Sequence, residues 1–129
     1  MSSNPDTITA HNLSLESIKA YHIHNHHKQL VSQSYVISSE VDKILSAVDQ
    51  PIAASFSQPS QYYLIKSNFP FVSPTQSSIP FPVKEVIIIP AQTWNEPHQL
   101  WLRKPTGEWL RFHSKQPLAP IIKSLKTKR

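Results

Sequence analysis

The feature that most constrains the fold is the stretch 98–113, which contains the only glycine of the chain. Pro105, Thr106 and Gly107 have the composition of a three-residue hairpin loop, with glycine at the position that needs a positive φ. The residues on either side alternate in opposite senses and therefore predict an antiparallel hairpin. The turn fixes the predicted pairs as Arg103 with Trp109, Leu102 with Leu110, Trp101 with Arg111, and Leu100 with Phe112.

Cross-strand partners share a face, so this hairpin is predicted to have two unlike faces. One is apolar, with Leu100, Leu102, Leu110 and Phe112, and suits the core. From the periodicity of the other elements, the remaining core residues are expected to be Val41, Ile44, Leu45, Val48, Leu64, Val86, Ile88, Ile121, Ile122 and Leu125. The other carries Trp101, Arg103, Trp109, Arg111 and His113. Three interpretations stay open for this second face: stacking of bases with arginines on phosphates, contact with a protein, or packing under a helix of the same chain.

The charge distribution favours an anionic partner. The chain has 129 residues with 13 Lys and Arg against 8 Asp and Glu, a formal charge of +5. Basic residues gather in the last quarter, where Lys123 and Lys126 follow the hairpin. Nucleic acid, RNA or DNA, or a protein is therefore the expected partner. A single glycine beside twelve prolines excludes a glycine-rich phosphate loop.

The length predicts a single domain, and the absence of cysteine excludes disulfides and thiolate chemistry. No membrane segment is expected, because the longest uninterrupted apolar run, Val86 to Ile89, is far too short. Met1 to Thr7 lacks the features of a secretory signal. A cytoplasmic protein is expected, or a nuclear one in a eukaryote.

The expected fold is α+β, with two N-terminal helices, a mainly antiparallel sheet of about five strands and a C-terminal amphipathic helix. Residues 1–11 are expected to be a disordered tail, 12–126 the domain and 127–129 a basic tail. The first helix is placed at 13–31 and the second from a cap at Ser39 to a position before Pro51. Strands are expected at 52–56 and 61–66, joined as a hairpin, and at 83–89, a central strand. The last helix begins near Pro117.

A long loop at 68–82 separates two of these strands. It carries four prolines and interleaved phenylalanines, so a regular strand cannot run through it. The sequence is compatible with a segment that fills the core or with a binding loop.

The histidines His22, His24, His26 and His27 suggest a metal site, but only weakly. On a helix, His22 and His26 would be stacked at i and i+4, and His24 and His27 at i and i+3, spacings that can hold a transition metal. On a strand, His22, His24 and His26 would share a face. The remaining ligands are missing, since there is no cysteine and the nearest acid is Glu16. The sequence therefore predicts no metal and no cofactor, with His22 and His26 as weak candidates.

The composition favours a small non-catalytic binding or adaptor protein that uses the Trp/Arg face and the basic C-terminus. The alternative is a small basic ribonuclease-like enzyme with His98 or His113 as general acid or base, oriented by Glu96 or Glu108. No nucleophile elbow, carboxylate pair or zinc motif supports an enzyme, so the expectation leans towards binding. Oligomeric state does not follow from the sequence.

Overall fold

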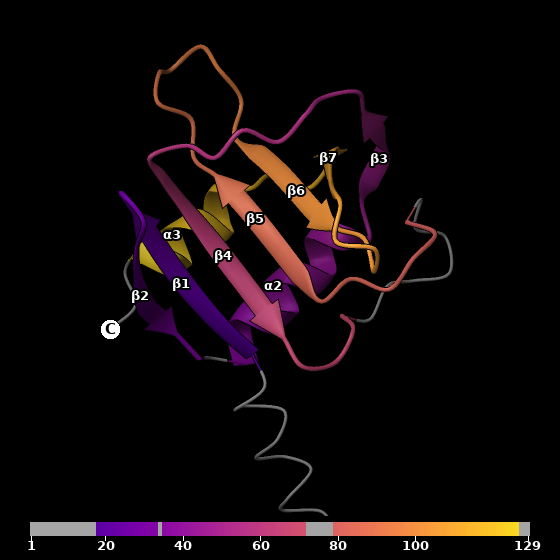
Figure 1. Cartoon of the computed structure of the whole chain (residues 1–129), viewed down its shortest axis with the longest axis horizontal. Coiled ribbons are helices and arrows are strands. Elements are labelled where there is room, and N and C mark those ends of the chain that lie inside the picture. The colour runs from indigo at the N-terminus through magenta and orange to yellow at the C-terminus, as the bar shows by residue number, and fades with distance from the viewer. Residues whose placement is uncertain (1–17, 34, 72–78, 127–129) are drawn as a thin grey trace, which may run out of the picture.

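The computed structural model describes residues 18–33, 35–71 and 79–126, so the predicted tails at 1–11 and 127–129 lie outside the described residues. Figure 1 shows a twisted sheet with helices behind it. The elements are the strands β1 (Ile18–His24), β2 (His27–Ser32), β3 (Val48–Ile52), β4 (Gln61–Ser67), β5 (Glu85–Ile89), β6 (Gln99–Arg103) and β7 (Trp109–Ser114), and the helices α2 (Tyr35–Leu45) and α3 (Ala119–Lys126).

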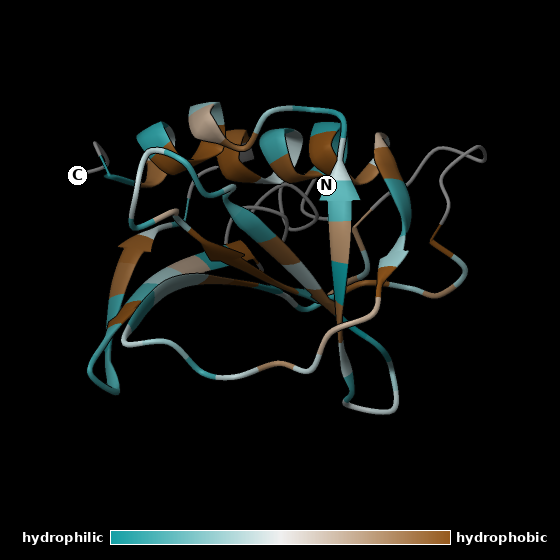
Figure 2. Cartoon of the chain, turned by 90° about the horizontal axis from the view of Figure 1, so that it is seen from above, coloured by the Kyte–Doolittle hydropathy of each residue, from teal (hydrophilic) through white to brown (hydrophobic). Residues whose placement is uncertain are grey.

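The strands form one sheet in the order β2-β1-β4-β5-β6-β7-β3, and every neighbouring pair is antiparallel. Both helices lie on the same side of it (Figure 2). The prediction of two N-terminal helices and about five strands is therefore wrong: the described chain has seven strands, with α2 between β2 and β3. We call the side of the sheet away from the helices the open face.

The predicted first helix at 13–31 is a hairpin where the structure describes it. In β1, Ile18 and Ala20 are buried on the helix side of the sheet and Ile23 on the open face, so that both faces of the strand are partly covered. Asn25 and His26 form a two-residue loop, and both have positive φ, 51° and 73°. Such loops match the twist of the two strands they join. Tertiary pairing of β1 with β4 then overrides the helical spacing of the few apolar residues.

The second predicted helix exists but is displaced. It starts at Tyr35 and ends at Leu45, so Ser39 lies inside it and is not its cap. Residues 48–52 form the edge strand β3, which pairs with β7. The predicted strand at 52–56 and its hairpin with 61–66 are wrong, because residues 53–56 are not a strand and β4 pairs with β1 and β5. Pro51 is tolerated there because an edge strand leaves one row of backbone groups unpaired.

The main core lies between the sheet and the two helices. Most of the residues predicted to form the core are buried there. Strand β5 lies at the centre of the sheet, and all four of its residues from Val86 to Ile89 are buried. Leu64 and Leu110, also predicted to be core residues, are only half-buried. The buried residues of this core include Val41, Ile44, Leu45, Val48, Val86, Ile88, Leu100, Leu102, Phe112, Ile121, Ile122 and Leu125.

The predicted hairpin at 98–113 is confirmed with all four of its named pairs. Gly107 has a φ of +98°, a conformation that side chains disfavour. Its amide donates to the carbonyl of Lys104 at 2.8 Å, and the amide of Lys104 donates to the carbonyl of Glu108 at 2.8 Å. The turn therefore sets the register of β6 and β7 by local chemistry alone.

The connection from β3 to β4, residues 53–60, passes across the open face, and we call it the strap (Figures 1 and 2). The ring of Phe56 lies 5.1 Å from that of Trp101 and 5.8 Å from that of Trp109, measured between centroids. The strap is also held by a hydrogen bond from the amide of Asn25 to the carbonyl of Ser60, 2.8 Å. A segment of the chain itself, and not a helix, therefore covers part of the tryptophan face.

The ends of the loop at 68–82 pack against the core, whereas its middle, 72–78, lies outside the described residues. Phe71 is buried and its amide donates to the carbonyl of Val83 at 2.9 Å. Phe81 packs on Phe112. Among the helices described, none has the length and apolar character needed to cross a membrane.

Candidate nucleic-acid interface

Strand register places a row of charged side chains across the open face. Lys19 of β1 lies directly opposite Lys66 of β4, and Lys66 lies opposite Glu85 of β5. Both carboxylate oxygens of Glu85 accept hydrogen bonds from Nη1 of Arg103, each at 3.1 Å. We call Lys19, Lys66 and Arg103 the basic row.

The two lysines of this row are not neutralised by the chain as far as it is described. Like charges directly opposite one another on neighbouring strands are destabilising. The only acid in the row, Glu85, is engaged by Arg103, and neither Lys19 nor Lys66 has an ion pair within the ranges that the structure covers. An anion bound between the two ammonium groups would relieve their repulsion.

A row of apolar and aromatic residues runs beside the basic row. Tyr21, Leu64, Ile87 and Trp101 are successive cross-strand partners on β1, β4, β5 and β6. Tyr21 and Leu64 are half-buried, while Ile87 and Trp101 are buried. We call these four residues the apolar row, and its accessible part is the end formed by Tyr21 and Leu64.

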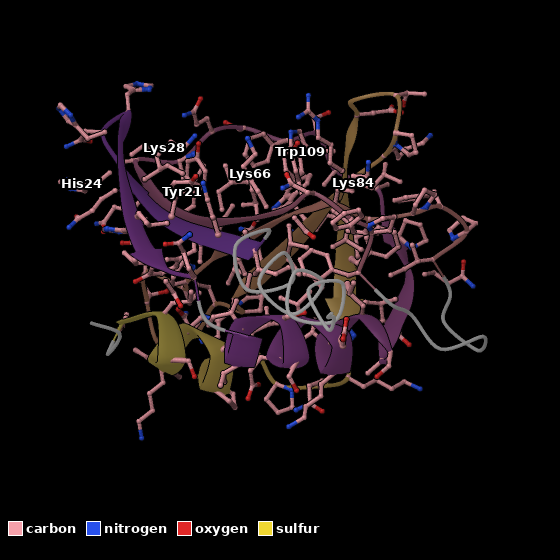
Figure 3. The ribbon with its side chains drawn as sticks, turned by 90° about the horizontal axis from the view of Figure 1, so that it is seen from below. Tyr21, His24, Lys28, Lys66, Lys84 and Trp109 are labelled. Carbon is pink, nitrogen blue, oxygen red and sulfur yellow. The ribbon has the colours of Figure 1, made fainter. Side chains whose placement is uncertain are left out.

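Cations lie over two aromatic rings of this face. Nζ of Lys28 is 4.4 Å from the ring centroid of Tyr21, and the guanidinium carbon of Arg103 is 5.7 Å from that of Trp109. Figure 3 shows Tyr21, Lys28, Lys66, Lys84 and Trp109 together on the side of the sheet away from the helices. Positive charge and partly exposed aromatic surface therefore occupy the same face.

The basic row continues into a cleft of about 500 Å3 beside the turn between β6 and β7. Lys84, Arg103 and Lys104 line it, with Glu85 as the acid. Lys104 forms an ion pair with Glu108 at 3.2 Å, whereas Lys84 forms none with the described residues. The positive surface thus extends beyond the strands.

The residues predicted to bind a partner do not form one surface. Trp101 is 3% exposed and belongs to the core under the strap, whereas Arg103, Trp109 and Arg111 are half-buried on the open face and His113 is exposed. Lys123 and Lys126 lie on α3, on the opposite side of the sheet. The predicted union of hairpin and basic C-terminus therefore splits into two separate regions.

The histidine cluster follows the strand alternative for His22 and His24 and not for His26. His22 and His24 lie on one strand with their ring centroids 6.2 Å apart, while His26 lies in the turn, so the helical i, i+4 pair does not exist. His22 packs against Tyr63, whose pKa burial raises above its ordinary value. In the part of the chain described, no three His, Cys, Asp or Glu side chains come together as a metal group.

A second group of polar side chains lies on and beside β7, near its pairing with β3. His98, Arg111 and His113 line a cleft of about 280 Å3. Nδ1 of His113 is 2.9 Å from Oδ2 of Asp49, and Nζ of Lys115 is 3.8 Å from Oδ1 of the same carboxylate.

The acids predicted to orient a histidine have other partners. Glu108 pairs with Lys104, and Glu96 accepts hydrogen bonds from the amide of Gln92 and the hydroxyl of Thr93, which hold the pKa of its carboxyl below the ordinary value. The acid beside a histidine is Asp49, which the sequence interpretation did not consider.

No family model, curated protein or solved structure matches this chain. Function must therefore be argued from the residues themselves. The sequence analysis missed Lys19, Lys28 and Lys66 as functional candidates. A helix at 13–31 would place Lys19 and Tyr21 on different faces, whereas a strand places them on the same face. The available signal for a strand was the spacing of Lys19, Tyr21 and Ile23 at every second position, which places them on one face.

Proposed function

We propose that this protein is a binding protein that holds single-stranded nucleic acid on the open face. The observation that carries the proposal is the directly opposed pair Lys19 and Lys66, which lacks an acid partner among the described residues. Together with Arg103 and Lys84 this pair offers a path for phosphates along one edge of the face.

The neighbouring apolar row favours a single strand over a duplex. Phosphates on Lys19 and Lys66 bring the attached bases next to the half-buried side chains of Tyr21 and Leu64, where an unpaired base would displace the ammonium of Lys28 from the Tyr21 ring. Stacking on an aromatic residue contributes about 1–3 kcal/mol per base and tolerates any sequence. In a duplex the faces of the bases are already stacked on one another, so Tyr21 could add no stacking energy to the binding of a duplex.

Binding is tested with a fluorescein-labelled single-stranded DNA of about 20 nucleotides, by anisotropy over a range of salt concentrations. The logarithm of affinity should fall linearly with the logarithm of salt, with a slope of about 0.7 per phosphate neutralised. Replacing both Lys19 and Lys66 by Ala should weaken binding and lower the slope by about 1.4. Glu85→Gln should strengthen binding at low salt, because it removes the acid of the row.

Lys43→Ala is the matched control, because Lys43 is exposed in the last turn of α2 on the other side of the sheet. It should leave the affinity and the slope nearly unchanged.

Quenching of Trp109 is measured by fluorescence in a Trp94→Phe background, since Trp94 is 96% exposed and would dominate the signal. Absence of binding and of quenching at low salt would refute the proposal and leave a protein partner as the better explanation of the face.

A further inference from the structure

The cleft lined by His98, Arg111 and His113 brings together chemistry that the binding proposal does not use. Asp49 and His113 are 64 residues apart in the sequence and meet only because β3 pairs with β7. The Asp49 carboxylate is placed to accept a hydrogen bond from Nδ1 of His113, which favours the tautomer whose lone pair is on Nε2, and the His113 side chain is 64% exposed to solvent. This is the arrangement of an oriented general base.

The other two side chains of the cleft suit a phosphate group. Arg111 has no ion pair with the residues that are described, so its guanidinium is available to a phosphodiester oxygen. Nδ1 of His98 accepts a hydrogen bond from the amide of Ala91 at 2.8 Å, which leaves the proton on Nε2 as a donor. The cleft therefore combines a base with two donors for the same anionic group.

We propose that this cleft cleaves single-stranded RNA without a metal ion, an inference that rests on the proposed nucleic-acid binding. Nε2 of His113 takes the proton of a ribose 2′-hydroxyl, and the 2′-oxygen attacks the adjacent phosphorus while Arg111 and His98 hold its non-bridging oxygens. The bond from phosphorus to the 5′-oxygen breaks, and the leaving oxygen takes a proton from water. The products are a 2′,3′-cyclic phosphate and a 5′-hydroxyl, and His113 returns its proton to solvent.

The position of the cleft agrees with the binding face. Arg111 lies opposite Trp101 across β6 and β7, at the far end of the apolar row from Tyr21. The strap covers Trp101 between these two ends, so a nucleic-acid strand held at Tyr21 would pass over the strap to bring its backbone to Arg111 and His113. Asp49 does not touch the substrate in this scheme and acts as a positioning residue for His113.

The test uses the full chain, a 5′-labelled single-stranded RNA of about 20 nucleotides and the DNA of the same sequence, in EDTA. Wild-type protein should cut the RNA only and leave cyclic phosphate ends. His113→Ala and His113→Gln should slow cleavage by about 10²–10⁴-fold, the usual contribution of a general base. Both variants should bind the DNA as wild type does. Asp49→Asn should lower kcat with little change in KM, since it disturbs the base and not the phosphate contacts.

His27→Ala is the control, because His27 is exposed at the start of β2 and lies outside the cleft. It is purified in the same way and should cut at the wild-type rate. Cleavage that survives in both His113 variants, or that EDTA abolishes, would overturn the inference. RNA that stays intact while the DNA binds with the expected salt dependence would also overturn it, but would leave the binding proposal standing. Absence of binding to either strand would refute both.

Discussion

Truncating Phe56 to alanine tests whether the strap packs on the open face. The Phe56 ring is half-buried and contacts Trp101, Trp109 and Tyr62, the last with ring centroids 6.4 Å apart. Removing a fully buried Phe costs about 3–5 kcal/mol of unfolding free energy, and aromatic pairs contribute about 0.5–1.5 kcal/mol each. Half-burial reduces this cost, so we expect a loss of about 1.5–2.5 kcal/mol.

Urea unfolding followed by circular dichroism measures this loss. The corresponding decrease in Tm is about 6–10 °C for a chain of this size. Phe69→Ala is the matched control, because Phe69 is 56% exposed, and it should cost far less. If the two variants lose the same stability, the strap does not pack as described, and the reasoning that places Trp101 in the core fails.

Two further changes test local features. His26→Gly should raise the unfolding free energy by about 0.5–1 kcal/mol, because glycine adopts the φ of 73° without the penalty that histidine pays; a decrease in urea unfolding would contradict the two-residue turn. The lowered pKa of Glu96 means that the turn held by the amide of Gln92 and the hydroxyl of Thr93 is stabilised above the ordinary pKa of 4.5 and loses this stabilisation as the pH falls through the lower folded-state value. The Gln92 amide should report this loss by NMR, and Glu96→Gln should abolish the pH dependence.

Elements with strong local chemistry could be predicted from the sequence. Pro105 and Gly107 specify one turn, and that turn fixes every pair between β6 and β7. The continuous apolar run of β5 identified the central strand, and the apolar stripe of Ile121, Ile122 and Leu125 identified α3. In each case the local preference and the tertiary environment agree.

Failures occurred where pairing partners lie far apart in the sequence. Residues 18–32 contain apolar residues at helical spacings as well as an alternating pattern, and the pairing of β1 with β4 decides between them. Nothing near residues 48–52 indicates that they complete the far edge of the sheet beside β7. The candidate sites could not be predicted for the same reason, because Lys19 lies opposite Lys66, and Asp49 contacts His113, only through these distant pairings.

The order of the strands has a consequence for how the chain folds. Strands β5, β6 and β7 are neighbours in both sequence and space, so they can assemble by closing the connections 90–98 and 104–108, whereas β4 reaches β5 only across residues 68–84. The two edges of the sheet are different. Along the chain, β2, α2 and β3 lie between β1 and its partner β4, and β4, β5 and β6 lie between β3 and its partner β7 (Figure 1). Closing long loops slows folding. We therefore expect the β5–β7 meander to acquire amide protection first in pulsed hydrogen exchange, and the opposed lysines and the Asp49–His113 pair to form in the last phase.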